Sequence, residues 1–325
     1  MFEGRKFYLL KDFKLSLAFQ KGVNFSSFFY SMTTQFIHYI RDEKRYSDHT
    51  VSAYVSDLNQ FNEYLSTTYE INDPVEADYQ MIRSWIVQLS QDKISNRSIN
   101  RKLSTLKSFY RFLIREGVVK SNPLSKIINP KASKRLPEFL DKSKTEFLFS
   151  QVEFEDTPEG HRDRTILELF YATGIRQAEL RSLTLNSLDT DRMSLKVLGK
   201  RNKERIIPLG PNIVQLLTLF IKDYRKLMVV SNQNNFIFVT KIGEPITPLL
   251  VYRIVRKYLG LVSSRQKRSP HVLRHTFATH MLENGADLNA IKEILGHSSL
   301  AATQVYTHNT IDRLKLIYKQ AHPKA

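Results

Sequence analysis

The sequence contains no cysteine. This absence excludes disulfide bonds, thiolate zinc sites, iron–sulfur clusters and a cysteine nucleophile, and it is typical of a reducing cytosol, where we expect this chain. Acidic residues are also few, because 32 Asp and Glu stand against 49 Lys and Arg and give a formal net charge of +17. Such an excess favours a long polyanion as partner, and nucleic acid is the commonest one.

Long apolar runs are missing as well. The longest uncharged stretch near the N-terminus, residues 22–40, carries too many hydroxyl, amide and imidazole side chains to cross a bilayer. The first residues also lack the order of a secretory signal, which is a basic end, an apolar core and a small-residue cleavage site. We therefore expect no membrane partner and no export, and 325 residues predict two globular domains.

No metal or nucleotide motif is present. His271 and His275 have the spacing of zincin ligands, but Val272 occupies the position of the required glutamate. The glycine-rich loop of nucleoside triphosphatases is missing too. We expect a reaction without metal, ATP or another cofactor.

The positive charge is concentrated in one region. Eleven basic residues and one acid, Glu116, lie between Arg97 and Arg135, so more than half of the excess charge comes from about an eighth of the chain. Within it, apolar residues recur on one side of a predicted helix and basic residues on the other. A face that is merely solvated normally mixes both signs, so we predict that this helix contacts phosphates.

Periodicity predicts a mainly α fold with a small antiparallel β-sheet. The first part of the chain has four predicted helices, at 35–42, 51–65, 81–89 and 97–115. The second part has further helices, at 142–152, 162–171, 213–224, 248–259 and from 271 onward. Alternation predicts a hairpin through 193–197 and 205–209 and a short strand at 236–239.

Composition divides the chain into four parts. Residues 1–31 hold nine aromatics at irregular spacing. This extension is either a packing or partner segment, or a poorly ordered stretch upstream of a functional start at Met32, and we favour the second. Residues 121–137 contain three prolines and several basic residues, which predicts a basic linker between domains at 32–120 and 138–325.

Several cationic and proton-transferring residues have settings that suit phosphate chemistry. Arg176 follows a glycine that ends a predicted helix, and His271 and Arg274 are one helical turn apart. His297 also follows a glycine, and Tyr306 lies nine residues further on. Each of these alone is more often a salt-bridge partner, a core histidine or a packing aromatic, so the argument depends on their combination.

Three segments carry a family resemblance: RDRTILELFYATGIRQAEL at 162–180, GKRNKERIIPLG at 199–210, and SPHVLRHTFATHMLENGADLNAIKEILGHSSLAATQVYTH at 269–308. They resemble the tyrosine recombinase (phage-integrase-like) family. The third segment and the His-Pro-Lys-Ala ending are similar to the Xer subgroup, which resolves bacterial chromosomes. The resemblance runs from about Thr33 to Ala325 and implies a helical, SAM-like core-binding domain followed by a catalytic domain.

The resemblance also implies transesterification at a DNA phosphodiester by six residues: Arg176, Lys200, His271, Arg274, His297 and Tyr306. The two arginines would hold the non-bridging oxygens, because a guanidinium can bind two phosphate oxygens at once. Tyr306 would be the nucleophile of a 3′-phosphotyrosyl intermediate. Lys200 would protonate the leaving 5′-oxygen, His271 would act as general acid/base, and His297 would hydrogen-bond the phosphate.

Neighbouring polar residues have structural interpretations. Lys203 competes with Lys200, which matches the family position better. Glu179 and Asp163 are expected to cap helices or support the site. Structural roles are also expected for three further histidines, His275, His280 and His308.

Nine basic residues are expected to contact DNA: Arg97, Arg101, Lys102, Lys107, Arg111, Arg115, Lys131, Lys134 and Arg135. The helix at 97–115 is the candidate for reading bases in the major groove. In the tail, the apolar pattern from Ile311 through Leu314, Leu316 and Ile317 to Tyr318 exceeds what one domain must bury. Packing on its own domain is one interpretation; the resemblance favours docking into a neighbouring protomer of a homo- or hetero-tetramer on two DNA sites.

The resulting hypothesis is a site-specific DNA recombinase that resolves chromosome dimers at a dif-like site, with a paralogous recombinase and a DNA translocase as candidate partners. One alternative is an integrase or resolvase of a mobile element. A type IB topoisomerase is disfavoured by the Xer-like tail. A non-catalytic DNA-binding protein is disfavoured by the six residues occurring together.

Overall fold

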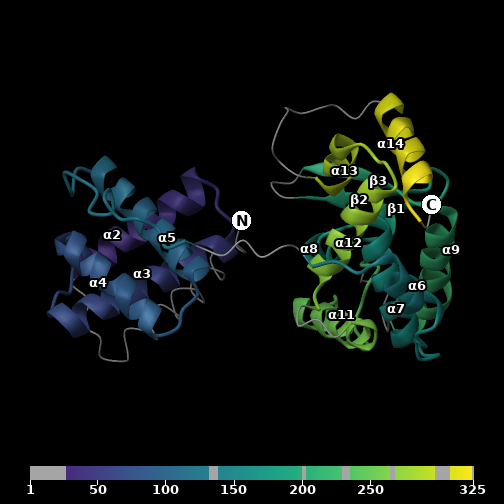
Figure 1. Ribbon diagram of the computed structural model, residues 1–325, viewed down its shortest axis with the longest axis horizontal. Coiled ribbons are helices and arrows are strands. Elements are labelled where there is room, and N and C mark those ends of the chain that lie inside the picture. The colour runs from purple at the N-terminus through teal and green to yellow at the C-terminus, as the bar shows by residue number, and fades with distance from the viewer. Residues whose placement is uncertain are drawn as a thin grey trace, which may run out of the picture. The chain divides into compact units, whose positions relative to one another are not determined.

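The computed structural model describes residues 27–131, 138–199, 203–228, 235–263, 268–296 and 308–323. The chain divides into two compact units, Met1–Arg135 and Leu136–Ala325 (Figure 1). Each unit has its own cluster of buried apolar side chains. Within the described residues, we find no helix with both the length and the apolar character needed to cross a membrane.

The N-terminal unit is a four-helix domain. Its helices are α2 (Ser27–His38), which continues into the π-helical turn η1 (Tyr39–Glu43), then α3 (Asp48–Tyr69), α4 (Tyr79–Gln91) and α5 (Asn96–Arg115), with a short 3-10 turn η2 (Pro74–Glu76). The starts of α3, α4 and α5 are set by capping side chains, because Ser47, Asp78 and Ser95 each accept a backbone N–H of the first turn. Helix α2 begins before Met32; residues 1–26 of the expected extension lie outside the described residues.

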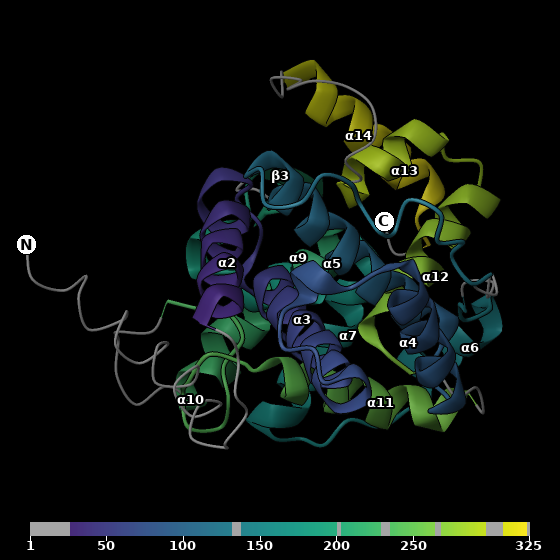
Figure 2. The same ribbon diagram turned by 90° about the vertical axis from the view of Figure 1, so that its left-hand side faces the viewer.

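Helix α3 contacts the other three helices, and Figure 2 shows it in the middle of the unit. The core includes Phe36 of α2, Phe61 of α3, Trp85 of α4 and Phe109 of α5, all almost fully buried. Phe36 and Phe109 pack edge to face with their ring centroids 5.3 Å apart. One face of α5 is therefore committed to this core, as its apolar spacing predicts.

Part of the expected linker packs onto this unit. Leu124 and Ile127 are buried in the same cluster as α5. The side-chain amides of Asn100 and Asn96 donate to the backbone oxygens of Pro130, at 2.8 Å, and Lys131, at 2.9 Å. Residues 121–131 are thus held by the N-terminal unit; residues 132–137 lie outside the described part, and the basic linker at 121–137 stays a prediction.

The C-terminal unit is mostly helical with a small antiparallel sheet. Its helices are α6 (Lys142–Ser150), α7 (Pro158–Thr173), α8 (Gln177–Arg181), α9 (Pro211–Leu219), η5 (Phe220–Arg225), α10 (Lys226–Met228), α11 (Pro248–Val262), α12 (Pro270–Glu283), α13 (Leu288–Leu295) and α14 (His308–Ala321), with a 3-10 turn η3 (Leu185–Ser187). The strands are β1 (Leu188–Asp189), β2 (Ser194–Leu198) and β3 (Glu204–Pro208), in the order β1-β2-β3. This confirms the fold class expected from the sequence.

The hairpin of β2 and β3 pairs Leu195 with Ile207 and Val197 with Arg205. Two details of the sheet differ from expectation. β1 was not predicted, because a two-residue strand leaves no alternation to detect. The segment at 236–239 is not a regular strand but makes isolated bridges, from Phe236 to Thr184 and from Val239 to Pro245.

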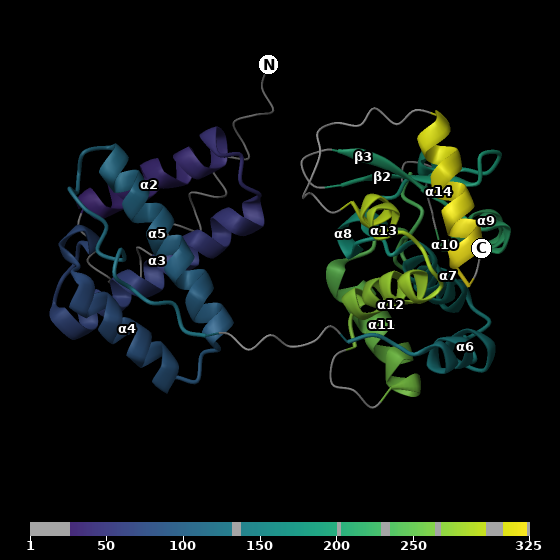
Figure 3. The same cartoon turned by 45° about the horizontal axis from the view of Figure 1, so that its top comes forward.

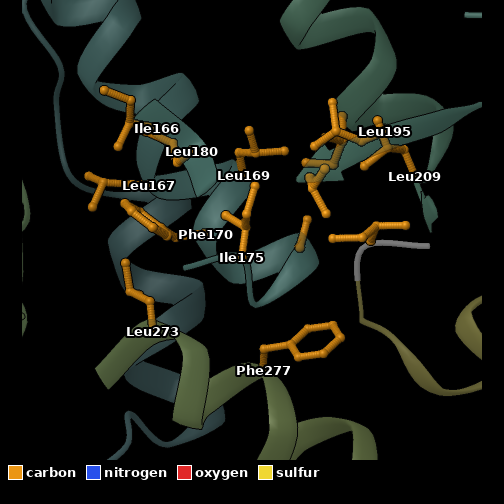
Figure 4. Close-up of a cluster of buried hydrophobic side chains, with 14 of the residues drawn as sticks. Ile166, Leu167, Leu169, Phe170, Ile175, Leu180, Leu195, Leu209, Leu273 and Phe277 are labelled. Atoms are coloured by element: carbon orange, nitrogen blue, oxygen red, sulfur yellow. The ribbon is translucent and has the colours of Figure 1, made fainter. Parts of the chain in front are cut away.

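Helix α7 is the buried centre of the C-terminal unit. Its residues Ile166, Leu169 and Phe170 are fully buried and lie in one cluster with Leu273 and Phe277 of α12 (Figure 4). Helices α7 and α12 are in extensive contact. This packing fixes α12, which carries Arg274, and α7, whose C-cap Gly174 lies two residues before Arg176.

The tail helix α14 packs on its own domain. Leu314, Tyr318 and Ala321 are buried in the cluster that also contains α7 and α12, whereas Leu316 is exposed. The helix contacts β3, α12 and α13, and Figure 3 shows it beside them. The imidazole of His322 stacks on Tyr318, and Asn284 of α12 donates to the backbone oxygen of Ala321 at 2.7 Å. In the single chain, the tail helix α14 is therefore packed on its own domain. Docking into a neighbouring protomer would require these contacts within the domain to break.

Candidate active site

Arg176 is positioned by the glycine that ends α7. Gly174 is the C-cap with φ +59°, and a Cβ there would lie 2.6 Å from Leu295 and 2.7 Å from Phe277, so only glycine fits. Two residues later Arg176 is the N-cap of α8. The carboxylate of Glu179 accepts its backbone N–H at 2.8 Å and its guanidinium at 2.8 Å.

Arg274 reaches the same place from α12. Its side chain is buried, and its guanidinium donates to the backbone oxygens of Gly174 and, at 2.8 Å, of Leu295. Arg274 therefore bridges the C-terminal ends of α7 and α13. Burial and then the nearby charge of Arg176 lower the pKa of Arg274 to about 10, which leaves it protonated at neutral pH.

The C-terminus of α13 organises three arginines. Its last three carbonyl oxygens each accept one guanidinium: Ile294 from Arg205 at 2.7 Å, Leu295 from Arg274 at 2.8 Å, and Gly296 from Arg176 at 3.0 Å. Carbonyls at this end of a helix lack partners inside the helix and carry partial negative charge, so they suit cations. Gly296 closes α13 with φ +65°, a conformation that favours glycine.

Arg176, Arg274 and Leu295 face a cleft of about 270 Å³. The described residues that line it are Arg176, His271, Arg274, His275, Ala278 and Leu295. The carboxylate of Glu179 pairs with Arg176 and Arg205, and the guanidinium of Arg274 is close enough to feel the charges of all three, so three arginines here stand against one acid. A cleft with this charge is suited to bind an anion such as a phosphodiester.

The structure thus brings together three of the six residues predicted for catalysis, namely Arg176, His271 and Arg274. The other three, Lys200, His297 and Tyr306, lie outside the described residues. The glycines that immediately precede two of them are described: a Cβ at Gly199 would come 3.5 Å from the guanidinium of Arg205, and one at Gly296 would come 3.2 Å from it.

Sequence reasoning missed Arg205. It is 4% exposed and lies on the inward face of β3, the same face as Ile207. The signal was the alternation itself, because an arginine at a core-facing position of a strand requires a buried partner. That partner is Glu179, for which a supporting role was expected.

Two of the histidines with an expected structural role, His275 and His280, have described side chains. His275 lines the cleft; burial, with the charges of His271 and Arg274, lowers its pKa, which favours a neutral imidazole. His280 is buried, with its ring hydrogen-bonded to the hydroxyl of Tyr171. Among the described residues, no three His, Asp or Glu side chains are grouped so that they could hold a metal ion.

On the N-terminal unit, helix α5 presents part of the expected basic surface. Arg97 and Arg111 are exposed, and within the described residues neither forms an ion pair with a carboxylate. Lys107 donates to the side chain of Asn129 at 2.9 Å, and Lys131 is exposed. Lys134 and Arg135 lie outside the described part of the chain.

Lys102 departs from the expectation of a phosphate contact. It is 5% exposed, and its ammonium group contacts Asp57, at 3.2 Å, and Gln60 of α3. In this fold the ammonium group is enclosed between two helices and paired with a carboxylate, so Lys102 is not presented to a phosphate.

Two further arginines of α5 are neutralised in part. The guanidinium of Arg101 makes a bidentate pair with the buried carboxylate of Asp57. Arg115 pairs with Glu43 at 2.9 Å and with Glu116 at 2.8 Å. Acids from α3 and η1 therefore balance charges that looked unopposed along the sequence.

Comparison with known proteins decides the family. Residues 138–313 match the phage integrase family, and residues 33–117 match the N-terminal SAM-like domain of phage integrases. The chain is 38% identical to the tyrosine recombinase XerC of Lacticaseibacillus casei over 291 residues, which is 89% of this chain and 97% of that protein. It is also 38% identical to XerC of Bacillus subtilis over 292 residues, 89% of this chain and 95% of that protein.

The chain belongs to the tyrosine recombinase (phage integrase) family. The expected resemblance, including the Xer subgroup, is confirmed, and the reaction of the recombinase is the breakage and rejoining of DNA.

Solved structures agree on the fold of the recombinase. The XerH site-specific recombinase in a post-cleavage complex with palindromic difH substrate has a TM-score of 0.66 and 21% identity, over 90% of this chain and 82% of that one. The Tn1549 transposon integrase in complex with transposon right end DNA has a TM-score of 0.63 and 19% identity, over 87% and 97%.

Proposed function

We propose that the recombinase cleaves DNA with six residues, Arg176, Lys200, His271, Arg274, His297 and Tyr306. The observation that carries this proposal is the convergence of Arg176, His271 and Arg274 on one cleft, with both guanidiniums oriented by backbone carbonyls of α13. Fixed cations at the phosphate oxygens stabilise the charge that develops as the phosphorus is attacked.

The proposed reaction conserves the phosphodiester energy. The phenolic oxygen of Tyr306 attacks the scissile phosphorus while His271 accepts its proton. The bond from phosphorus to the 5′-oxygen breaks, and Lys200 gives that oxygen a proton. The product is a 3′-phosphotyrosyl bond and a free 5′-hydroxyl, and attack by a 5′-hydroxyl reverses these steps and rejoins the strand.

The test is covalent trapping on a nicked suicide substrate, from which the cleaved fragment diffuses away. We expect Tyr306→Phe to bind DNA as the wild type does and to form no covalent adduct, because the attacking oxygen is missing. Tyr252→Phe, at a partly exposed position of α11, is the matched control and should form adduct at the wild-type rate. An adduct in Tyr306→Phe would overturn the assignment of the nucleophile.

We further propose that the recombinase resolves chromosome dimers at a dif-like site during segregation, as a homo- or hetero-tetramer on two sites, with a paralogous recombinase and a DNA translocase as partners. Support comes from the XerC names of its relatives and from the difH substrate of the XerH structure. A second candidate function is the movement of a mobile element, and its support is the structural likeness to a transposon integrase.

Recombination assays separate the two roles. Purified recombinase, alone and with a paralogue, is offered pairs of dif-like sites or pairs of element ends from the same genome. Exchange at dif-like sites, together with chromosome dimers that accumulate when the gene is deleted, supports the chromosomal role. Exchange at element ends alone would replace it with the mobile-element role.

A further inference from the structure

The side chain of Arg205 makes hydrogen bonds to several parts of the candidate active site. It is buried on β3, its two terminal nitrogens donate to the two carboxylate oxygens of Glu179 at 2.8 and 2.9 Å, and its Nε donates to the backbone oxygen of Ile294 at 2.7 Å. All three nitrogens of the guanidinium are therefore used. They join three elements, β3, α8 and α13.

Each of these contacts adjoins a residue of the proposed active site. Glu179 holds the guanidinium of Arg176 with the same carboxylate that receives Arg205. The backbone around Gly296, the residue before His297, lies against the Arg205 side chain, and Gly199, the residue before Lys200, lies near both Arg205 and Glu179. The Gly199 N–H also donates to the Lys203 oxygen at 2.8 Å, which closes the end of the hairpin that leads to Arg205.

Stability alone does not account for this arrangement. A buried ion pair frequently contributes no more to stability than well-packed apolar side chains of similar volume, and Ile207 occupies the same inward face of β3. An arginine differs in that it orients its partners, because the planar guanidinium holds a carboxylate and a carbonyl at defined angles. A lysine could satisfy one of these acceptors but could not reproduce the fork.

We propose that Arg205 is a positioning residue for DNA cleavage, which sets Arg176 and the backbone at Gly199 and Gly296, the residues before Lys200 and His297, relative to one another without contacting DNA. The inference rests on the proposed function of Arg176, Lys200 and His297. Because transition-state stabilisation depends on geometry at the scale of an ångström, small displacements at Arg205 should slow cleavage more than they weaken DNA binding.

The experiment compares Arg205→Met, Arg205→Lys and the control Glu204→Gln. Glu204 is the preceding residue on β3, and its exposed ion pair with Lys196 lies outside the cleft. For each variant we would measure the melting temperature, the dissociation constant for a single recombination half-site, and the single-turnover rate of adduct formation at saturating DNA.

We expect Arg205→Met to lower the adduct-forming rate by about 100-fold and Arg205→Lys by about tenfold, with DNA affinity within about twofold of wild type. Glu204→Gln should match wild type in all three measurements. If Arg205→Met fails to fold, Arg205→Lys decides. Wild-type cleavage by a folded Arg205 variant would overturn the proposal, as would a parallel loss of melting temperature, affinity and rate in Arg205→Lys, which is the mark of a purely structural role.

The outcomes also separate this inference from the proposed function. If the wild-type recombinase forms no adduct on any recombination half-site, the proposed function fails before Arg205 is tested. If the wild type forms the adduct, Tyr306→Phe does not, and the Arg205 variants cleave at full rate, only the positioning role of Arg205 is lost.

Discussion

At the scale of single residues, Glu179 is the charge on which the site depends. It is 4% exposed, and three donors from two arginine side chains and one from the backbone converge on its two oxygens. Burial by itself would raise the pKa of this carboxyl. The hydrogen bonds and charge of Arg205, with the contribution of Arg176, outweigh burial and lower the pKa to about 2.

This shift predicts how Glu179→Gln changes stability with pH. The folded-state pKa lies below the unfolded value, so the stabilisation is complete above about pH 5 and is lost as the pH falls towards 2. We expect the variant to be less stable than wild type by about 3 kcal/mol at pH 7, because it leaves Arg205 buried without a counter-charge. Urea unfolding at pH 7, 5, 4 and 3 should show this difference shrinking as the pH falls.

Glu204→Gln is again the control, because its ion pair with Lys196 is exposed at both ends and should change stability by less than about 1 kcal/mol. A difference between Glu179→Gln and wild type that stays constant from pH 7 to pH 3 would show that the carboxylate is not the stabilising form.

At the scale of elements, α5 separates basic residues with a role in the fold from those available to DNA. Lys102 and Arg101 are tied to Asp57 of α3, whereas Arg97 and Arg111 are exposed. The two groups are interleaved along one helix, because the carboxylate of Asp57 pairs with Arg101 and Lys102. Charge counted along the sequence therefore overstates the basic surface of this helix.

Substitutions on α5 should distinguish the two groups by salt dependence. For Arg111→Ala we expect the slope of log K against log salt concentration to fall in magnitude by about 1, with little loss of stability, because each phosphate contact contributes about 0.9. For Lys102→Met we expect an unchanged slope and a loss of stability, since Asp57 loses a partner. Half-site binding between 50 and 300 mM salt, together with urea unfolding, measures both.

The two slopes are informative in either direction. An unchanged slope in Arg111→Ala would remove that face of α5 from the DNA interface. A reduced slope in Lys102→Met would mean that the lysine leaves Asp57 and reaches DNA.

The elements also show what local sequence can and cannot predict. The helices and the hairpin were predicted because caps such as Ser47 and periodic apolar positions lie within a few residues of each other. The partnership of Arg205 with Glu179, 26 residues apart, and that of Lys102 with Asp57, 45 residues apart, depend on how elements pack. Arg176 and Arg274 were recognised by motif, but their shared use of the α13 carbonyls follows only from three dimensions.

At the scale of the whole molecule, the packing of the tail helix α14 bears on how copies of the chain could assemble. Helix α14 buries Leu314 and Tyr318 in its own domain, and the same surfaces would be available to an identical tail from a neighbouring copy. An exchange of tails would replace each contact with its equivalent, so it costs little apart from the opening. In the tetramer proposed above, an exchange of tails would therefore supply one contact between neighbouring protomers without a new surface for the tail.

The absence of cysteine provides a direct test of tail exchange. Asn284 and the Ala321 backbone are hydrogen-bonded, so single variants Asn284→Cys and Ala321→Cys place one thiol on each side of this contact. Mixed and oxidised on DNA with two sites, they should give a disulfide-linked pair of chains, which neither variant can form within itself. The two chains without DNA are the control, and no cross-link between them on DNA would contradict the exchange.

The three carbonyls at the end of α13 have a consequence for how the recombinase can vary. Every amino acid carries the same backbone oxygen, so no side-chain replacement at Ile294 or Leu295 deletes the acceptor that holds Arg205 or Arg274. Mutation can disable this support only by bending or shifting the helix end. The arginines are thus held by backbone atoms that a side-chain replacement does not remove, although the burial of Ile294 and Leu295 and the positive φ of Gly296 restrict which residues can occupy these positions.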